Sequence, residues 1–271
     1  PDVPDSPASP LLYPRFLGRR DEVGHLHSVM ASVQRGEGVS AAVMGSAGAG
    51  KTRFLEELTA DARLQGFQII SGACPSGGGN PLQPVVSALR NAQKEIRSIH
   101  SWVQDDDRPE LARLFPELAP ENAEEVPEDF RREDQSALFA ALFSVFESLG
   151  RAKPLFLAID DIQWADSSTL AFLGFAAERL NGLPILLCLA HRPFEEKPRP
   201  EWMNNSIAVE LSPLGTEATE DLVASLFGTV DAPEGLIDLI YRISGGNPFH
   251  VIETVKSLVD KGSIVWRDSQ W

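Results

Sequence analysis

Eight consecutive residues carry the strongest chemical signal in this sequence. They satisfy every fixed position of the phosphate-binding pattern G-x-x-x-x-G-K-[ST], and they are Gly45, Ser46, Ala47, Gly48, Ala49, Gly50, Lys51 and Thr52. Glycines let the backbone curl closely enough for its N–H groups to surround a phosphate. Lys51 supplies a mobile positive charge for β- and γ-phosphates, and the Thr52 hydroxyl is suited to Mg²⁺. The stretch therefore predicts a site for a nucleotide phosphate chain with Mg²⁺.

The flanking residues place this phosphate loop between a strand and a helix. Residues 39–44 form an apolar run typical of a buried strand, and a helical pattern extends from residue 51 to about residue 63. The unpaired N–H groups and the positive dipole end of that helix would then face the phosphates. The alternative is a tight strand-to-helix turn with a chance Lys-Thr pair, and the agreement of motif and context disfavours it.

A second apolar run, residues 154–159, ends in the two carboxylates Asp160 and Asp161, as in a Walker B element. We expect this strand to neighbour the phosphate-loop strand, since open parallel sheets bind ligands at the carboxyl ends of their strands. Asp160 would hold Mg²⁺ opposite Thr52. Asp161, pointing to the other side of the strand end, would orient or deprotonate the attacking water. Helix capping is the alternative role, and Asp166 fits it better.

The elements that must position these residues alternate between strands and helices up to about residue 212. Further strands are expected at 67–73, 183–190 and 207–211. A first helix is expected to end at about residue 34, and further helices are expected at 84–99, 136–149 and 167–180. Strands that are apolar on both sides are typical of a parallel sheet covered by helices. The predicted fold class is therefore α/β, a P-loop NTPase three-layer sandwich with a parallel sheet, followed by a small α-helical lid domain.

The chain divides into four expected units. These are a Pro-rich linker at 1–14, a P-loop ATPase domain at 15–212, a helical lid domain at 213–262 and the truncated start of a further unit at 263–271. The lid rests on three helical patterns without intervening strands, at 216–227, 233–244 and 248–261. An acidic, proline-punctuated stretch at 105–134 is expected to form short helices in an exposed insertion.

Charge and composition disfavour several classes of partner. The formal net charge of the 271 residues is −15 at pH 7, which disfavours direct contact with nucleic acid or an anionic membrane. No apolar run reaches the length of about eighteen residues that a membrane span needs, so a cytoplasmic protein is expected. Cys74 and Cys188 lie in or after apolar runs and are expected to be reduced structural thiols. His191 follows Cys188 by three residues but lacks a second ligand pair, so a structural role is expected.

Four motifs, taken together, resemble a known family. They are Phe16-Leu17-Gly18-Arg19 ahead of a helix, the phosphate loop, Asp160-Asp161-Ile162-Gln163-Trp164-Ala165-Asp166 and Gly246-Asn247-Pro248-Phe249. Their order and spacing resemble the STAND class of P-loop ATPases. These are AAA+-related signalling switches, similar to the ATPase modules of bacterial LuxR-type regulators and of kinase or cyclase fusion proteins. The resemblance covers residues 15–262.

The first motif of that family implies a nucleotide contact near the start of the chain. Phe16, Leu17, Gly18 and Arg19 match it, and Arg19 with the backbone beside it would contact the adenine or ribose side of ATP or ADP. A surface arginine beside a turn glycine is the alternative. Arg20 departs from the family, because it stands where the family has an acidic residue.

The resemblance implies two further contacts from later in the chain. Pro248 would pack on the nucleotide from the helical domain, although a glycine that ends one helix and a proline that starts the next also explain this motif. Arg192, at a strand end, matches the sensor position that reads the γ-phosphate, with a solvent-facing structural arginine as the alternative. The implied catalytic residues are Lys51, Asp160, Asp161 and Arg192.

Together with the phosphate-site residues, the resemblance implies a slow, Mg²⁺-dependent ATPase that works as a conformational switch within a larger signalling or transcription-control protein. Its expected partners are the nucleotide, the other domains of the same chain and further copies of the chain in a nucleotide-dependent assembly. One alternative is an AAA+ motor that remodels protein or DNA, which predicts a ring with an arginine finger. The other is a structural nucleotide-binding module without turnover.

Overall fold

The computed structural model describes residues 14–93, 99–119, 132–194, 198–228 and 235–265. Residues 1–13 of the predicted linker and residues 266–271 of the predicted C-terminal unit lie outside the described residues. No helix in the described ranges combines enough length with enough apolar character to cross a bilayer.

Five parallel strands form one sheet in the order β2 (Gln68–Ala73), β3 (Leu155–Asp160), β4 (Ile185–His191), β1 (Val39–Met44) and β5 (Ile207–Glu210). The predicted parallel sheet is therefore confirmed. The expectation that β3 neighbours β1 is wrong, because β4 lies between them and pairs with both. All seven residues of β4 are buried, which favours a central place with a strand on each side.

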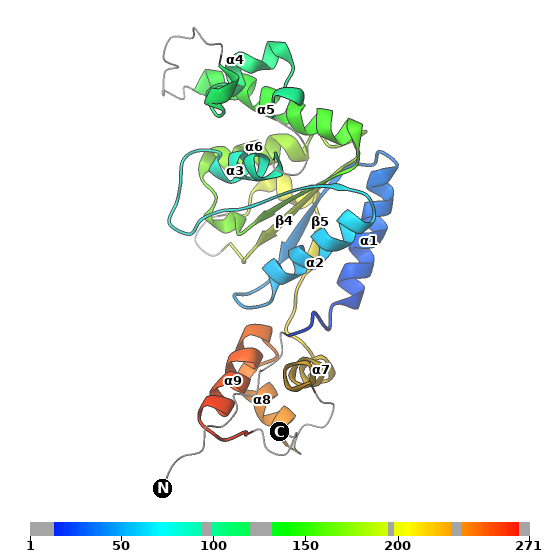
Figure 1. The fold of residues 1–271 in the computed structure, drawn as a ribbon, viewed down its shortest axis with the longest axis vertical. Helices are drawn as coiled ribbons and strands as arrows, with labels where there is room; N and C mark the ends of the chain where they lie inside the picture. The colour runs from blue at the N-terminus through cyan, green and yellow to red at the C-terminus, as the bar shows by residue number, and fades with distance from the viewer. Residues whose placement is uncertain (1–13, 94–98, 120–131, 195–197, 229–234, 266–271) are drawn as a thin grey trace.

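Helices cover both faces of this sheet in three layers (Figure 1). One face is covered by α1 (Arg20–Gln34) and α2 (Lys51–Leu64), and the other by α3 (Gln83–Ala92), α5 (Arg132–Ala152) and α6 (Ser167–Ala177). Successive residues of β4 point to opposite faces: Cys188 packs beneath α1 and α2, whereas Leu187 and Leu189 pack beneath the other three helices. The sheet and the helices that cover it, which we call the sheet domain, therefore have two hydrophobic cores. This confirms the predicted sandwich.

Part of the acidic stretch is buried. It contains the short helices η2 (Asp105–Asp107), α4 (Arg108–Leu111) and η3 (Pro116–Leu118), which follow η1 (Ile99–Ser101). Leu111, Phe115 and Leu118 are almost fully buried in the core beneath α3 and α5. The expected exposed insertion is therefore wrong for the described residues. Apolar side chains spaced by four and three positions give this stretch one face that packs, while its carboxylates remain outside.

Three further helices form a separate bundle, which we call the helical domain, below the carboxyl edge of the sheet (Figure 1). They are α7 (Thr216–Phe227), α8 (Leu236–Ser244) and α9 (Pro248–Asp260). Their own core contains Leu222, Val223, Ile240, Val251 and Val255. The helical C-terminal region predicted from the sequence is thus present, and its α9 begins beside the phosphate loop. Two remaining short helices, η4 (Ile162–Trp164) and η5 (Glu201–Asn205), follow β3 and precede β5.

Candidate nucleotide-binding site

The phosphate loop lies between β1 and α2, with α9 of the helical domain against it. Gly48 has a φ of +77°, and a Cβ atom there would lie 2.6 Å from Asn247 Oδ1 and 2.8 Å from Phe249 Cβ. A side chain at position 48 is therefore excluded both by the backbone conformation and by the approaching helix. This glycine serves the contact between the two domains as well as the curl of the loop.

Lys51, the first residue of α2, is 7% exposed and folds back over the loop. Its Nζ donates hydrogen bonds of 2.9 Å to the carbonyl oxygens of Gly45 and Ser46. Burial, and then the positive charge of Arg192, lower the pKa of Lys51, while Asp161 and Asp160 act in the opposite direction. The Lys51 ammonium group thus lies near Asp160, Asp161 and Arg192, which the sequence predicted to surround the phosphates.

Thr52 and Asp160 meet although their elements are not adjacent in the sheet. Helix α2 packs against both β4 and β3, which brings the Thr52 hydroxyl across β4 to donate a 2.6 Å hydrogen bond to Asp160 Oδ2. Asp160 is 7% exposed, and this burial raises its pKa, whereas the hydrogen bond from Thr52 opposes the rise. A buried carboxylate beside a hydroxyl offers the hard oxygen ligands that Mg²⁺ prefers. These two residues therefore fit a magnesium ion.

Asp161 lies just beyond β3 in a left-handed backbone conformation, with φ +55° and ψ +38°. Its N–H donates to Asp160 Oδ1 at 2.7 Å, so both oxygens of the Asp160 carboxylate accept a hydrogen bond. The Asp161 carboxylate accepts a 2.7 Å hydrogen bond from Gln163 Nε2, and Gln163 Oε1 accepts the Arg192 N–H at 3.0 Å. Asp166 accepts two backbone N–H groups at the start of α6 and is the helix cap that the sequence predicted.

A cavity of about 440 Å³ lies between the sheet domain and the helical domain. That volume is within the range of about 300–1,000 Å³ typical of small-molecule sites. Its polar wall contains Lys51, Thr52, Asp161 and Arg192, and its apolar wall contains Phe16, Leu17, Leu222, Pro248 and Ile252. The lining thus combines charged and polar groups that suit phosphates with apolar side chains that suit a flat base.

Most of the predicted nucleotide contacts line this cavity, but some do not. Phe16, Leu17, Arg19, Arg192, Pro248 and loop residues 48–52 belong to its lining. Gly18 instead packs against α7, where a Cβ would lie 2.7 Å from Ala218 Cβ. Gly45, Ser46, Ala47 and Asp160 are not among the residues that line the cavity.

Arg19 is held by protein groups although it borders the cavity. Its guanidinium is 5% exposed and donates to Glu22 at 3.2 Å, to the Ser212 carbonyl at 2.5 Å and to the Ala49 carbonyl at 3.5 Å. Ser212 lies in the segment that joins β5 to α7. Arg19 therefore links the phosphate loop, by hydrogen bonds, to the segment that connects the two domains.

Residues 15–188 match the AAA ATPase domain family. The chain belongs to that family. Residues 215–269 match a second family, which is described as a domain of unknown function. The chain is also 25% identical over 266 residues to an uncharacterized protein of Rhizobium meliloti, R02095, and the match covers 88% of this chain but only 24% of that protein.

Several solved structures share the fold of this AAA ATPase domain. A mutant of RuvB from Thermotoga maritima is 17% identical with a TM-score of 0.52, covering 93% of this chain and 66% of that one. ORC2 from Aeropyrum pernix, as ADPNP–ADP complexes, is 15% identical with a TM-score of 0.56, covering 98% and 67%. AMPPCP-bound DnaA from Aquifex aeolicus is 13% identical with a TM-score of 0.54, covering 92% and 63%.

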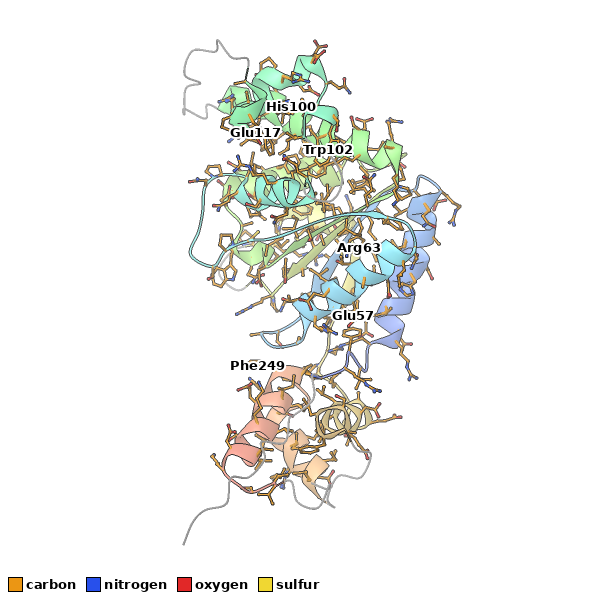
Figure 2. All side chains as sticks on the ribbon, in the orientation of Figure 1. Glu57, Arg63, His100, Trp102, Glu117 and Phe249 are labelled. Atoms are coloured by element: carbon orange, nitrogen blue, oxygen red, sulfur yellow. The ribbon has the colours of Figure 1, made fainter. Side chains whose placement is uncertain are left out.

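In this AAA ATPase, two residues of the domain contact were not predicted as site residues. Asn247 Nδ2 donates to the Ala47 carbonyl at 2.8 Å, and the Phe249 N–H donates to the Gly48 carbonyl at 3.3 Å. Figure 2 shows Phe249 at the end of α9 that faces the sheet domain. An Asn directly before a helix-starting proline predicts a cap, but nothing local predicts its contact with a loop 200 positions away.

Gln163 was also missed as a site residue, because an amide between two acidic motif positions has no distinctive pattern.

His191 fits its expected structural role: it is 1% exposed, and its Nδ1 lies 2.7 Å from the Arg192 carbonyl. Its ring packs against Phe194 with centroids 4.9 Å apart. Burial lowers the pKa of its imidazole, whereas the hydrogen bond with the Arg192 carbonyl opposes this shift.

Proposed function

We propose that this AAA ATPase module binds ATP or ADP with Mg²⁺ between its two domains, hydrolyses ATP slowly, and acts as a conformational switch. One observation carries the proposal: the helical domain touches the phosphate loop itself, through Asn247 and the Phe249 N–H, and walls the same cavity. A change in the phosphates bound at the loop would therefore act directly on the position of the helical domain.

The polar wall would supply the chemistry of hydrolysis. Lys51 would leave the loop carbonyls for the β- and γ-phosphates, and Thr52 with Asp160 would hold Mg²⁺. When bound, Mg²⁺ neutralises phosphate charge. Asp161 would orient the attacking water, and Arg192 would stabilise negative charge on the γ-phosphate side.

The apolar wall would receive the adenine and ribose. Phe16 and Leu17 approach this part of the cavity from the start of the sheet domain, and Pro248 approaches it from the helical domain. A base placed there would touch both domains at once, so its binding would favour the closed arrangement. Arg19 would act mainly by holding the loop and the inter-domain segment together around the nucleotide.

The switch would belong to a larger signalling or transcription-regulatory protein of the STAND class. The match to only 24% of the Rhizobium protein supports a module within a longer chain, and the four motifs support the class. An AAA+ motor and a binding module without turnover are the competing functions. Stimulated turnover in a stable hexamer would favour the motor, and nucleotide binding without hydrolysis would favour the module.

Replacing Lys51 tests the site. Lys51→Ala should reduce kcat/KM for ATP by about 100-fold or more, because it removes a preorganised charge from the phosphates. Lys153→Ala, which removes an exposed lysine just before β3, is the matched control and should retain wild-type turnover. ATP affinity and phosphate release would be measured in both variants. Unchanged affinity and turnover in Lys51→Ala would refute the assignment of the phosphate site.

A further inference from the structure

A continuous chain of hydrogen bonds crosses the site from α2 to the end of β4. Thr52 donates to Asp160, the Asp161 N–H donates to the other oxygen of Asp160, and the Asp161 carboxylate accepts from Gln163. Gln163 then accepts the backbone N–H of Arg192. The distances along this chain are 2.6, 2.7, 2.7 and 3.0 Å. Gln163 is therefore the link between the end of β3 and the end of β4.

The chemistry of the two partners fixes the orientation of the Gln163 amide. A carboxylate only accepts hydrogen bonds and a backbone N–H only donates, so Nε2 must face Asp161 and Oε1 must face Arg192. Glutamate could not make both bonds as a carboxylate, since one of its oxygens would face the Asp161 oxygens. Leucine could make neither bond. A neutral amide of this length suits the position on chemical grounds.

The backbone at Asp161 is shaped for the same contact. A non-glycine residue with a positive φ is uncommon, and such a conformation costs on the order of 1 kcal/mol or more. Here the left-handed turn is followed by the single turn of η4, in which the Trp164 N–H donates to the Asp161 carbonyl at 2.9 Å. This turn folds Gln163 back onto the carboxylate of the residue two positions before it.

We propose that Gln163 is a positioning residue that sets the place of the Asp161 carboxylate in the cavity and ties it to the strand end that carries Arg192. This inference rests on the proposed function, in which Asp161 orients the water that attacks ATP. Both Asp161 and Arg192 line the cavity, so a movement of the β4 end toward the γ-phosphate would be passed to Asp161 through one amide. Gln163 itself is not among the residues that line the cavity, and it acts through its neighbours.

The test separates positioning from folding and from nucleotide binding. Gln163→Leu should lower kcat for ATP by about 10- to 100-fold, since displacement of a catalytic group by about 1 Å can cost that much. KM for Mg-ATP and Kd for ADP should stay within about twofold, because none of the residues that line the cavity is replaced. Gln163→Glu should show the same loss although it retains the acceptor for the Arg192 N–H. Gln135→Leu, which removes an amide bonded to Ser168 outside the cavity, is the matched control and should leave kcat unchanged.

A double-mutant cycle shows whether Gln163 acts through Asp161. In an Asp161→Asn background, Gln163→Leu should cause no further loss of kcat. The same two substitutions should be non-additive in the denaturant midpoint of the nucleotide-free protein, which is a readout independent of turnover. Additive effects of the two substitutions in both measurements would overturn this inference alone. The inference would also be overturned if Gln163→Leu or Gln163→Glu kept a wild-type kcat while Asp161→Asn lost it. No ATP turnover in the unmodified protein would overturn the proposed function together with it.

Discussion

Asp160 and Asp161 are neighbours in the sequence but have different hydrogen-bond partners. Asp160 is bonded to Thr52 and to a backbone N–H, whereas the Asp161 carboxylate is bonded to Gln163. Asp160→Asn should therefore weaken Mg²⁺-dependent ATP binding. Asp161→Asn should keep Mg-ATP bound and slow hydrolysis by about 10²- to 10⁴-fold, the usual contribution of a general base.

Titration of ATP binding with and without Mg²⁺, beside the turnover rate, distinguishes the two carboxylates. The unmodified protein measured in parallel gives the reference for both variants. If both substitutions changed affinity and rate in the same way, the division of roles would be wrong.

The two cysteines are expected to be unreactive in the folded protein. Cys74 is 3% exposed and Cys188 is fully buried, and burial raises the pKa of each thiol to about 12. Because the thiolate is the reactive form, a disulfide reagent such as DTNB at pH 8 should find no accessible thiol before unfolding and 2 per chain afterwards. Rapid reaction of either thiol in the native protein would contradict this prediction.

The same shifts predict how stability depends on alkaline pH. The thiols of the unfolded chain ionise near pH 9, whereas those of the folded chain keep their protons to about pH 12. The folded state then binds more protons, so the free energy of unfolding falls as pH rises through this window. Serine at both positions should remove this part of the pH dependence in chemical denaturation.

Asn247, the residue directly before α9, serves two purposes. Asn247 Oδ1 accepts the N–H groups of Phe249 and His250, which caps the helix, while Nδ2 donates to the Ala47 carbonyl of the phosphate loop. Asn247→Asp separates these purposes, because a carboxylate keeps the cap and suits the positive helix end, but it opposes the carbonyl.

We expect Asn247→Asp to retain the stability of the helical domain and to lose the contact between the domains. ADP affinity should fall by about 5- to 10-fold, the equivalent of one lost hydrogen bond, and the radius of gyration measured by X-ray scattering should rise. Asn204→Asp, at an exposed position of η5, adds the same charge as a control. An unchanged radius and affinity would show that this hydrogen bond does not hold the domains together.

The whole molecule contains three hydrophobic cores in its described residues, two in the sheet domain and one in the helical domain. A nucleotide in the cavity between the domains would touch residues from both, and would therefore couple their unfolding. A ligand that binds only the folded state adds about 2.7 kcal/mol of stability at a hundred times its Kd, so ADP should raise Tm measurably.

Pro248 should contribute to this stabilisation if it touches the nucleotide. Pro248→Ala should then reduce the ADP-dependent rise in Tm more than it reduces Tm without ligand. A proline that only starts a helix should lower both stabilities equally, and Pro116→Ala in η3, outside the cavity, shows the size of that effect. Thermal melting of all three proteins across an ADP titration measures the difference. An ADP-dependent increment that is unchanged in Pro248→Ala would remove this residue from the site.

Local sequence determined the elements and the chemistry of the phosphate loop. Glycines, a lysine and a threonine at fixed spacing predict a loop between a strand and a helix, and these interactions lie within a few residues of one another. The apolar runs of β3 and β4 predicted buried parallel strands for the same reason, since alternation and length are local properties. The α/β sandwich and the helical C-terminal region could therefore be predicted.

Only the tertiary structure decided the order of the strands and the contacts that join distant segments. Nothing near Asp160 indicates that β4 lies between its strand and β1, or that α2 crosses β4 to bring Thr52 to it. The contact of Asn247 with Ala47, 200 positions away, cannot be seen in the local sequence either. Strand pairing and packing depend on surfaces that meet only when the chain is folded, so their partners cannot be read from residues that are close in the sequence.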